Sequence, residues 1–262
     1  MYRVNTCWKR LWMAAALGCL AGPAGANTVS FVTGPTHSTS GAAVNAAAEF
    51  IFDASAHTVT VELLNLQLNP TGVSQALSGV QFDLTNLSGY AAPTISSTSA
   101  STFDVAANGY ASADSETPHW VAEPVSGSTV TLCEICATHG HPDQLILGGP
   151  DAAMGSKDKY TAARGSIAGN PAHNSFLLGS GATYSEGVLA GLHSTPTWVL
   201  SLPQITVSTT VSQVRFYFGT TFGTNEVVDS LAMTPEPTPI VLIGGGVMLI
   251  MVARVARGLR KK

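Results

Sequence analysis

Two cysteines and two histidines lie within nine residues of the chain, in the order Cys133, Cys136, His139 and His141. Two thiolates and two imidazoles suit tetrahedral zinc, a Cys-x-x-Cys pair can act as a redox dithiol, and the same pair can form a plain disulfide that closes a small loop. Structural zinc sites usually separate their two ligand pairs by a longer stretch. We therefore expect a Cys133–Cys136 disulfide if the chain is exported to an oxidising compartment, and the metal and redox alternatives stay open.

Other residues with catalytic potential do not form a recognisable motif. The chain has seven histidines, but no Gly-x-Ser-x-Gly turn of the kind that exposes a hydrolase nucleophile. The run 148–151 is typical of a turn and lacks the Lys and Ser/Thr of a phosphate-binding loop. Asp143, Asp151 and Asp158 lack the alternating spacing of a calcium loop. We assign no catalytic residue, metal ligand or cofactor, and expect a protein that is not an enzyme.

Aromatic residues in the middle of the chain offer a second kind of chemistry. An exposed aromatic ring gives a flat apolar face with a polar edge, which suits stacking against a sugar. Burial in the core is the competing interpretation, and it is the one we expect for Trp198, Phe216 and Phe218, which occupy alternating positions in predicted strands. The candidates for polysaccharide binding are Tyr90, Tyr110, Trp120, Tyr160 and Tyr184.

Alternating apolar residues indicate the elements that must position these side chains. Segment 58–63 alternates with a period of two, and segment 48–53 lies four residues before it, which predicts a hairpin. Further strands are predicted at 77–84, 198–202, 205–207 and 214–218, with Pro203 at an edge or a break because it cannot donate to a ladder. The pattern predicts an all-β fold, a single antiparallel β-sandwich with long loops. The stretch 89–195 is poorly periodic and predicts loops with a few added strands.

The charges of the chain are segregated. Charged residues make up 11% of the sequence, and residues 27–234 hold 15 acidic and four basic residues, a formal net charge of −11. The remaining eight basic residues lie in 1–10 and 254–262. An acidic middle of this kind excludes a Lys/Arg-rich nucleic-acid binder, and the low charge content excludes a coiled coil.

The first 26 residues have the pattern of a secretory signal. Arg3, Lys9 and Arg10 precede an apolar run at 11–20, which is too short to span a bilayer. Small residues follow, and Ala24-Gly25-Ala26 fits the A-x-A cleavage pattern. We expect signal peptidase and the general export machinery to release a mature chain that begins at Asn27.

The last 28 residues have the pattern of a membrane anchor. The apolar run 240–252 is 13 residues long, about 20 Å as a helix. A helix extended to residue 259 would be about 30 Å long and would include Arg254 and Arg257. The longer helix is physically tolerable, because arginines near a helix end can place their charges at the interface. A basic tail follows that the positive-inside rule keeps in the cytoplasm. Its members are Arg254, Arg257, Arg260, Lys261 and Lys262.

Pro235-Glu236-Pro237, the short apolar helix and the terminal basic cluster, together with the signal peptide, closely resemble the PEP-CTERM sorting signal of exported bacterial surface proteins. The resemblance covers about the last 29 residues. It implies that an integral-membrane exosortase recognises Pro235, Glu236 and Pro237 and processes the chain there. The helix would then hold the chain in the membrane only during export. It also implies a route through the inner membrane to the cell-envelope surface or the exterior.

These observations divide the chain into a signal peptide (1–26), an exported β-sandwich (27–234) and a sorting signal (235–262). The expected function is that of a non-enzymatic cell-surface or extracellular-matrix protein. One alternative is a polysaccharide-binding module that uses the loop aromatics. Another is an extracellular enzyme or metal-binding module around residues 133–141.

Overall fold

The computed structural model describes residues 27–136, 144–150, 159–161, 175–184, 187–221, 226–228 and 231–233. In this part of the chain nearly all regular structure is β, which confirms the predicted fold class. The elements in chain order are β1 (Asn27–Val32), β2 (Thr36–His37), β3 (Ala43–Val44), β4 (Ala46–Asp53), β5 (Thr58–Asn65), the 3-10 helix η1 (Val73–Gln75), β6 (Leu77–Thr85), β7 (Thr94–Ser99), β8 (Thr102–Val105), β9 (Ala111–Ala113), β10 (Val121–Ser126), β11 (Thr129–Cys133), β12 (Leu145–Leu147), β13 (Ser175–Leu178), β14 (Thr197–Ser201), β15 (Thr210–Phe218), β16 (Glu226–Val228) and β17 (Leu231–Met233).

The first sheet has six strands in the order β17-β1-β4-β5-β14-β7 and is antiparallel throughout. Its centre is the predicted hairpin, in which Asp53 pairs with Thr58. The Asp53 carboxylate accepts hydrogen bonds from the backbone N–H groups of Ser55 and Ala56, both at 2.9 Å, which fixes the turn. Every second residue of β4 and β5 is buried, because successive side chains of a strand point to opposite faces of the sheet.

The second sheet has nine strands and is built around β6. The long strand β15 runs along one edge of β6, while β11 and β12 pair with successive parts of its other edge. The sheet continues from β12 through β13 and β8 to β9, and from β11 to β10. The strands β12 and β13 pair in parallel, so the prediction of a purely antiparallel arrangement is wrong at this pair.

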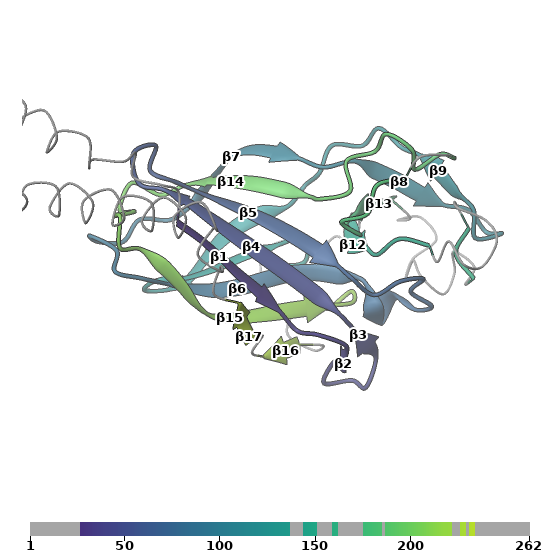
Figure 1. Ribbon diagram of the computed structural model, residues 1–262, viewed down its shortest axis with the longest axis horizontal. Coiled ribbons are helices and arrows are strands. Elements are labelled where there is room, and N and C mark those ends of the chain that lie inside the picture. The colour runs from purple at the N-terminus through teal and green to yellow at the C-terminus, as the bar shows by residue number, and fades with distance from the viewer. Residues whose placement is uncertain are drawn as a thin grey trace, which may run out of the picture.

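The two sheets form two layers that share a hydrophobic core (Figure 1). The rings of Phe50 in β4 and Phe82 in β6 meet across the layers with centroids 4.8 Å apart. Trp198, Phe216 and Phe218 are completely buried, which confirms their predicted place in the core. A second, smaller cluster surrounds Phe103 and Phe176 beside β8 and β13.

Two further predictions about strands are wrong. Residues 205–207 form no strand, because a turn follows Pro203 and Val207 is left 77% exposed. The stretch 89–195 is far richer in β structure than expected, since seven strands from β7 to β13 lie in it. Six of them, β8 to β13, supply most of the second sheet, and β7 is an edge strand of the first.

Candidate functional site

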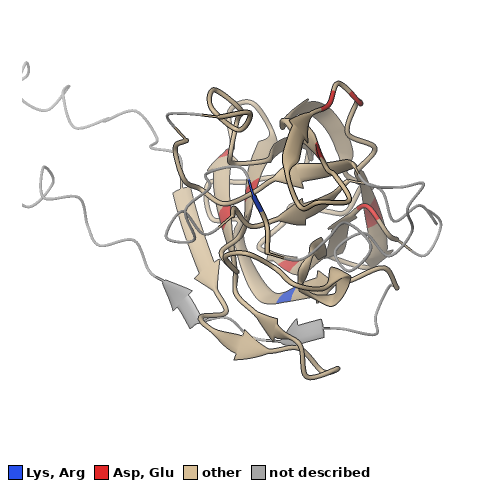
Figure 2. Ribbon diagram, turned by 90° about the vertical axis from the view of Figure 1, so that its right-hand side faces the viewer, with Lys and Arg blue, Asp and Glu red and all other residues tan. Residues whose placement is uncertain are grey.

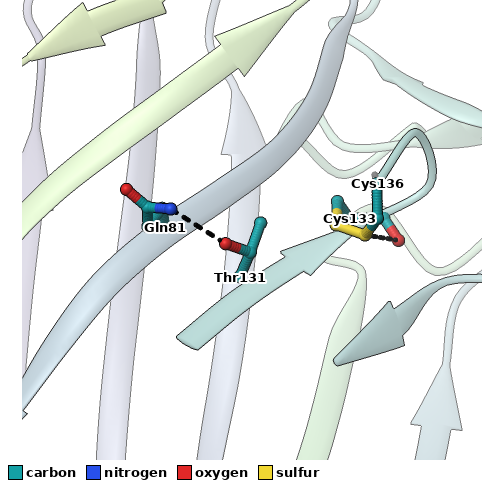
Figure 3. The surroundings of a disulfide bond; sticks show 4 residues. All are labelled: Gln81, Thr131, Cys133 and Cys136. Carbon is teal, nitrogen blue, oxygen red and sulfur yellow. Dashed lines mark hydrogen bonds between the residues drawn. A yellow bond between two sulfur atoms is a disulfide. The ribbon is translucent and has the colours of Figure 1, made fainter. Parts of the chain in front are cut away.

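Cys133 and Cys136 are joined in a disulfide at the end of β11 (Figure 3). Both cysteines are buried, with exposed fractions of 0% and 5%. Cys133 pairs with Gly79 of β6, where an added Cβ atom would lie 2.8 Å from the Cys133 Cβ, so glycine is needed for the approach. The Cys136 Sγ lies 3.5 Å from the Cys133 carbonyl oxygen, but a disulfide sulfur has no proton to donate. The bridge therefore closes a small loop that packs against the centre of the second sheet.

The disulfide and its burial weaken the two alternatives for the cysteine pair, a zinc site and a redox dithiol. Sulfur atoms that are bonded to each other are not thiolates, and a cysteine binds zinc as a thiolate. A redox dithiol is also a disulfide when oxidised, but the burial of both cysteines leaves little access for a redox partner. His139 and His141 lie outside the described residues. Among the residues that are described, no group of three or more His, Cys, Asp or Glu side chains is placed to hold a metal ion. Glu134, between the two cysteines, has a completely buried side chain that sequence reasoning did not single out.

The disulfide makes the stability of the natural chain sensitive to reductant. We expect dithiothreitol to lower its free energy of unfolding by about 2 kcal/mol, the chain-entropy contribution of so short a loop. The double variant Cys133→Ala/Cys136→Ala is the matched control and should give the same urea transition with and without reductant. A natural chain whose urea transition does not respond to dithiothreitol would contradict the disulfide.

Two of the five candidate sugar-binding aromatics are core residues, so the competing interpretation, burial in the core, holds for Trp120 and Tyr160. Trp120 is 4% exposed and its indole packs on Trp198 with ring centroids 4.6 Å apart. Its Nε1–H donates to the Gln144 carbonyl oxygen at 3.0 Å. Tyr160 is completely buried, and its hydroxyl donates to the Gly148 carbonyl oxygen at 3.0 Å. Burial raises the pKa of the Tyr160 hydroxyl well above its ordinary value. Both rings are unavailable to a ligand.

The other three aromatics do not form a common platform. Tyr184 is half-buried, and its hydroxyl donates to the Ser180 Oγ at 3.0 Å. Tyr90 and Tyr110 are each 44% exposed. Tyr90 lies in the connection after β6, whereas Tyr110 precedes β9 at the opposite end of the molecule (Figure 1). The Lys159 ammonium lies 5.2 Å from the centroid of the Tyr110 ring and partly covers it.

A carboxylate pair that sequence reasoning missed lies on the outer face of the first sheet. Glu49 of β4 and Glu62 of β5 are direct cross-strand neighbours. Partial burial raises the pKa of the Glu62 carboxyl, and repulsion from Glu49 raises it further, while His193 acts in the opposite direction. The register could have revealed the pair, because a four-residue turn that joins Asp53 to Thr58 places residue 49 opposite residue 62.

The same carboxylates border a small depression between β1, β4 and β5. Its volume is about 80 Å³ and Ala47, Ala48 and Leu64 contribute to its lining. Ligand pockets for small molecules are usually several times larger, on the order of 300 Å³ or more. This depression therefore does not qualify as a substrate site, and we assign no reaction to the glutamate pair.

The strands at the two ends of the described chain lie side by side. β1 begins at Asn27, the residue after the predicted signal cleavage site, and β17 ends at Met233, two residues before Pro235. β17 is antiparallel to β1, and Met233 pairs with Ser30. Ala24, Ala26, the motif 235–237 and the basic tail lie outside the described residues. The chain thus reaches both predicted processing sites from neighbouring strands.

Among the charged residues that the structure describes, acidic side chains predominate, and Lys159 and Arg215 are the basic ones (Figure 2).

No protein-family model matches the chain, and no curated protein matches it. Within the described residues, no helix has the length and apolar character needed to cross a membrane.

Proposed function

We propose that the chain is an exported, non-enzymatic protein of the cell surface or extracellular matrix, sorted through a PEP-CTERM-like signal. On this proposal residues 27–234 form the cargo, an acidic β-sandwich. Signal peptidase acts at Ala24-Gly25-Ala26, and an exosortase recognises Pro235-Glu236-Pro237. The helix after the motif holds the chain in the inner membrane until it is processed.

The observation that carries this proposal is the pairing of β17 with β1. An exported domain with membrane segments at both ends must let both segments reach the same bilayer. Met233 lies opposite Ser30, three residues into β1, so about 10 Å of strand separates it from the level of Asn27. A domain whose two ends lay at opposite poles would need a long linker to reach the same bilayer.

The alternatives have less support. Trp120 and Tyr160 are buried and cannot bind a polysaccharide, and the exposed Tyr90 and Tyr110 lie at opposite ends of the molecule and do not form one platform (Figure 1). A metal module around residues 133–141 would need thiolates, but the two sulfurs are joined in a disulfide. A redox enzyme would need a disulfide that its partner can reach, and both cysteines are buried. Neither alternative is favoured by a specific contact among the described residues.

The sorting step is tested by replacing Pro235, Glu236 and Pro237 together with alanine in the native host. We expect the variant to accumulate uncut in the inner-membrane fraction and to lose most of its surface or exterior population, as measured by immunoblotting of fractions. Pro239→Ala, a proline change just outside the motif, is the matched control and should be processed normally. Normal processing of the triple variant would refute the role of the motif.

A further inference from the structure

Four connections gather at the end of the molecule where β1 begins. They are residues 54–57, 86–93, 127–128 and 202–209, and we call them the charge-free end because they contain no Asp, Glu, Lys or Arg. Asp53 borders this end, with its carboxylate tied into the turn by hydrogen bonds from Ser55 and Ala56. Little hydration of formal charge has to be given up when such a surface meets an apolar or interfacial environment.

Backbone and side-chain hydrogen bonds hold these connections together as one surface. The Leu202 N–H donates to the His57 carbonyl oxygen, and the Ser88 N–H donates to the Gln204 carbonyl oxygen. The Asn86 side chain donates to the Ser208 carbonyl oxygen at 3.0 Å. The hairpin turn at 127–128 joins them, because the Leu84 N–H donates to the Ser128 carbonyl oxygen.

Both outgoing parts of the chain are directed to this end. Asn27 pairs with Phe52, one residue before the end of β4, so the 26 residues that precede β1 are attached here. β17 runs antiparallel to β1 and therefore points toward the same end as it leads into the final 29 residues (Figure 1). Each of these outer segments contains an apolar run with basic residues on the side that faces away from the domain in sequence.

Exposed apolar side chains lie on this surface. Val207 is 77% exposed and Tyr90 is 44% exposed, and both belong to the connections that define the end. Val125, 54% exposed, stands beside the 127–128 turn. Tyrosine is enriched at membrane–water interfaces, where its ring meets the apolar boundary and its hydroxyl meets the headgroups. These three side chains have no covering element among the described residues.

We propose that the charge-free end rests on the outer face of the lipid bilayer in which the terminal segments are inserted, with Tyr90, Val125 and Val207 in the headgroup region. This inference rests on the proposed export route. Three exposed side chains bind a membrane weakly on their own, but the C-terminal membrane segment, which stays attached after signal cleavage, turns the contact into an intramolecular one. The opposite end, which carries Asp114, Glu116 and Lys159, then faces away from the membrane.

Site-directed spin labelling of the full chain in phosphatidylcholine vesicles tests this orientation. Cys7 and Cys19 are replaced by serine, the Cys133–Cys136 disulfide is kept oxidised, and a nitroxide is attached through Val207→Cys. Leu68→Cys is the matched control, because Leu68 is a 54% exposed apolar residue in the connection after β5, at the opposite end. Neither substitution removes a buried side chain.

We expect the label at 207 to lose most of its collisions with a water-soluble nickel chelate when the chain is transferred from buffer into the vesicles. The label at 68 should keep its collisions. Resistance to alkaline extraction is measured on the same samples. An inserted chain with both labels equally open to water would overturn the orientation alone. A chain that alkali removes from the vesicles would instead contradict the proposed membrane route, and with it this inference.

Discussion

Replacing Trp120 with alanine is expected to lower the free energy of unfolding by about 3–5 kcal/mol, the usual cost of removing a large aromatic side chain from a core. Trp120 packs against Trp198 and belongs to the main core cluster. The substitution also removes the indole donor to the Gln144 carbonyl oxygen. Urea unfolding followed by circular dichroism measures the loss.

Tyr110→Ala is the control for this experiment, because Tyr110 is an exposed aromatic residue in the same part of the sequence. Its effect on stability should stay within about 0.5 kcal/mol, as for most surface substitutions. A Trp120→Ala variant as stable as the Tyr110→Ala variant would mean that Trp120 is not in the core. If the natural chain binds a polysaccharide, loss of binding in Trp120→Ala has to be read against its loss of stability.

The change Gly148→Ala is expected to cost about 3 kcal/mol or more, the upper part of the range for overpacking a core. An added Cβ atom at this position would lie 2.1 Å from the Gln67 carbonyl oxygen and 2.7 Å from that of Asn65. Both are backbone atoms, so no side-chain rotation relieves the overlap. The chain after β12 would have to move away from the end of β5, where the Asn65 side chain donates to the Ile146 carbonyl oxygen at 2.9 Å.

Gly89→Ala is the matched control for Gly148→Ala. Its nearest contact would be the Gln204 Cγ at 3.6 Å, an ordinary van der Waals distance to a side chain that can rotate. Its urea midpoint should stay close to that of the natural chain. Equal midpoints for Gly148→Ala and Gly89→Ala would show that the chain does not pass so close to residues 65–67.

The strands that sequence predicts well are those with one buried and one open face. In β5 and in the second half of β6 apolar residues alternate with polar ones, so a period of two is visible without any knowledge of the partner strands. In β12 and β13 every residue is buried, and the alternation disappears. A run of three or four apolar residues could equally belong to a buried helix, so these two strands gave no periodic signal in the stretch 89–195.

The missed features of the candidate site have a different origin. Trp120 follows Thr117-Pro118-His119 and looks like a loop residue, but pairing of β10 with β11 and contact with Trp198 bring it into the core. The need for glycine at 148 depends on residues 65–67, which are some 80 positions away in the chain. Such long-range approaches leave no local pattern. The glutamate pair, by contrast, follows from the hairpin register alone.

The most direct test of the account is the mass and terminal sequence of the protein that the native host delivers to its surface or medium. An exported cargo released from both membrane segments should begin at Asn27 and end near Pro235–Pro237. A surface or exterior chain that still carries Lys262 would contradict processing at the Pro-Glu-Pro motif, and one that still carries Met1 would contradict the signal peptide.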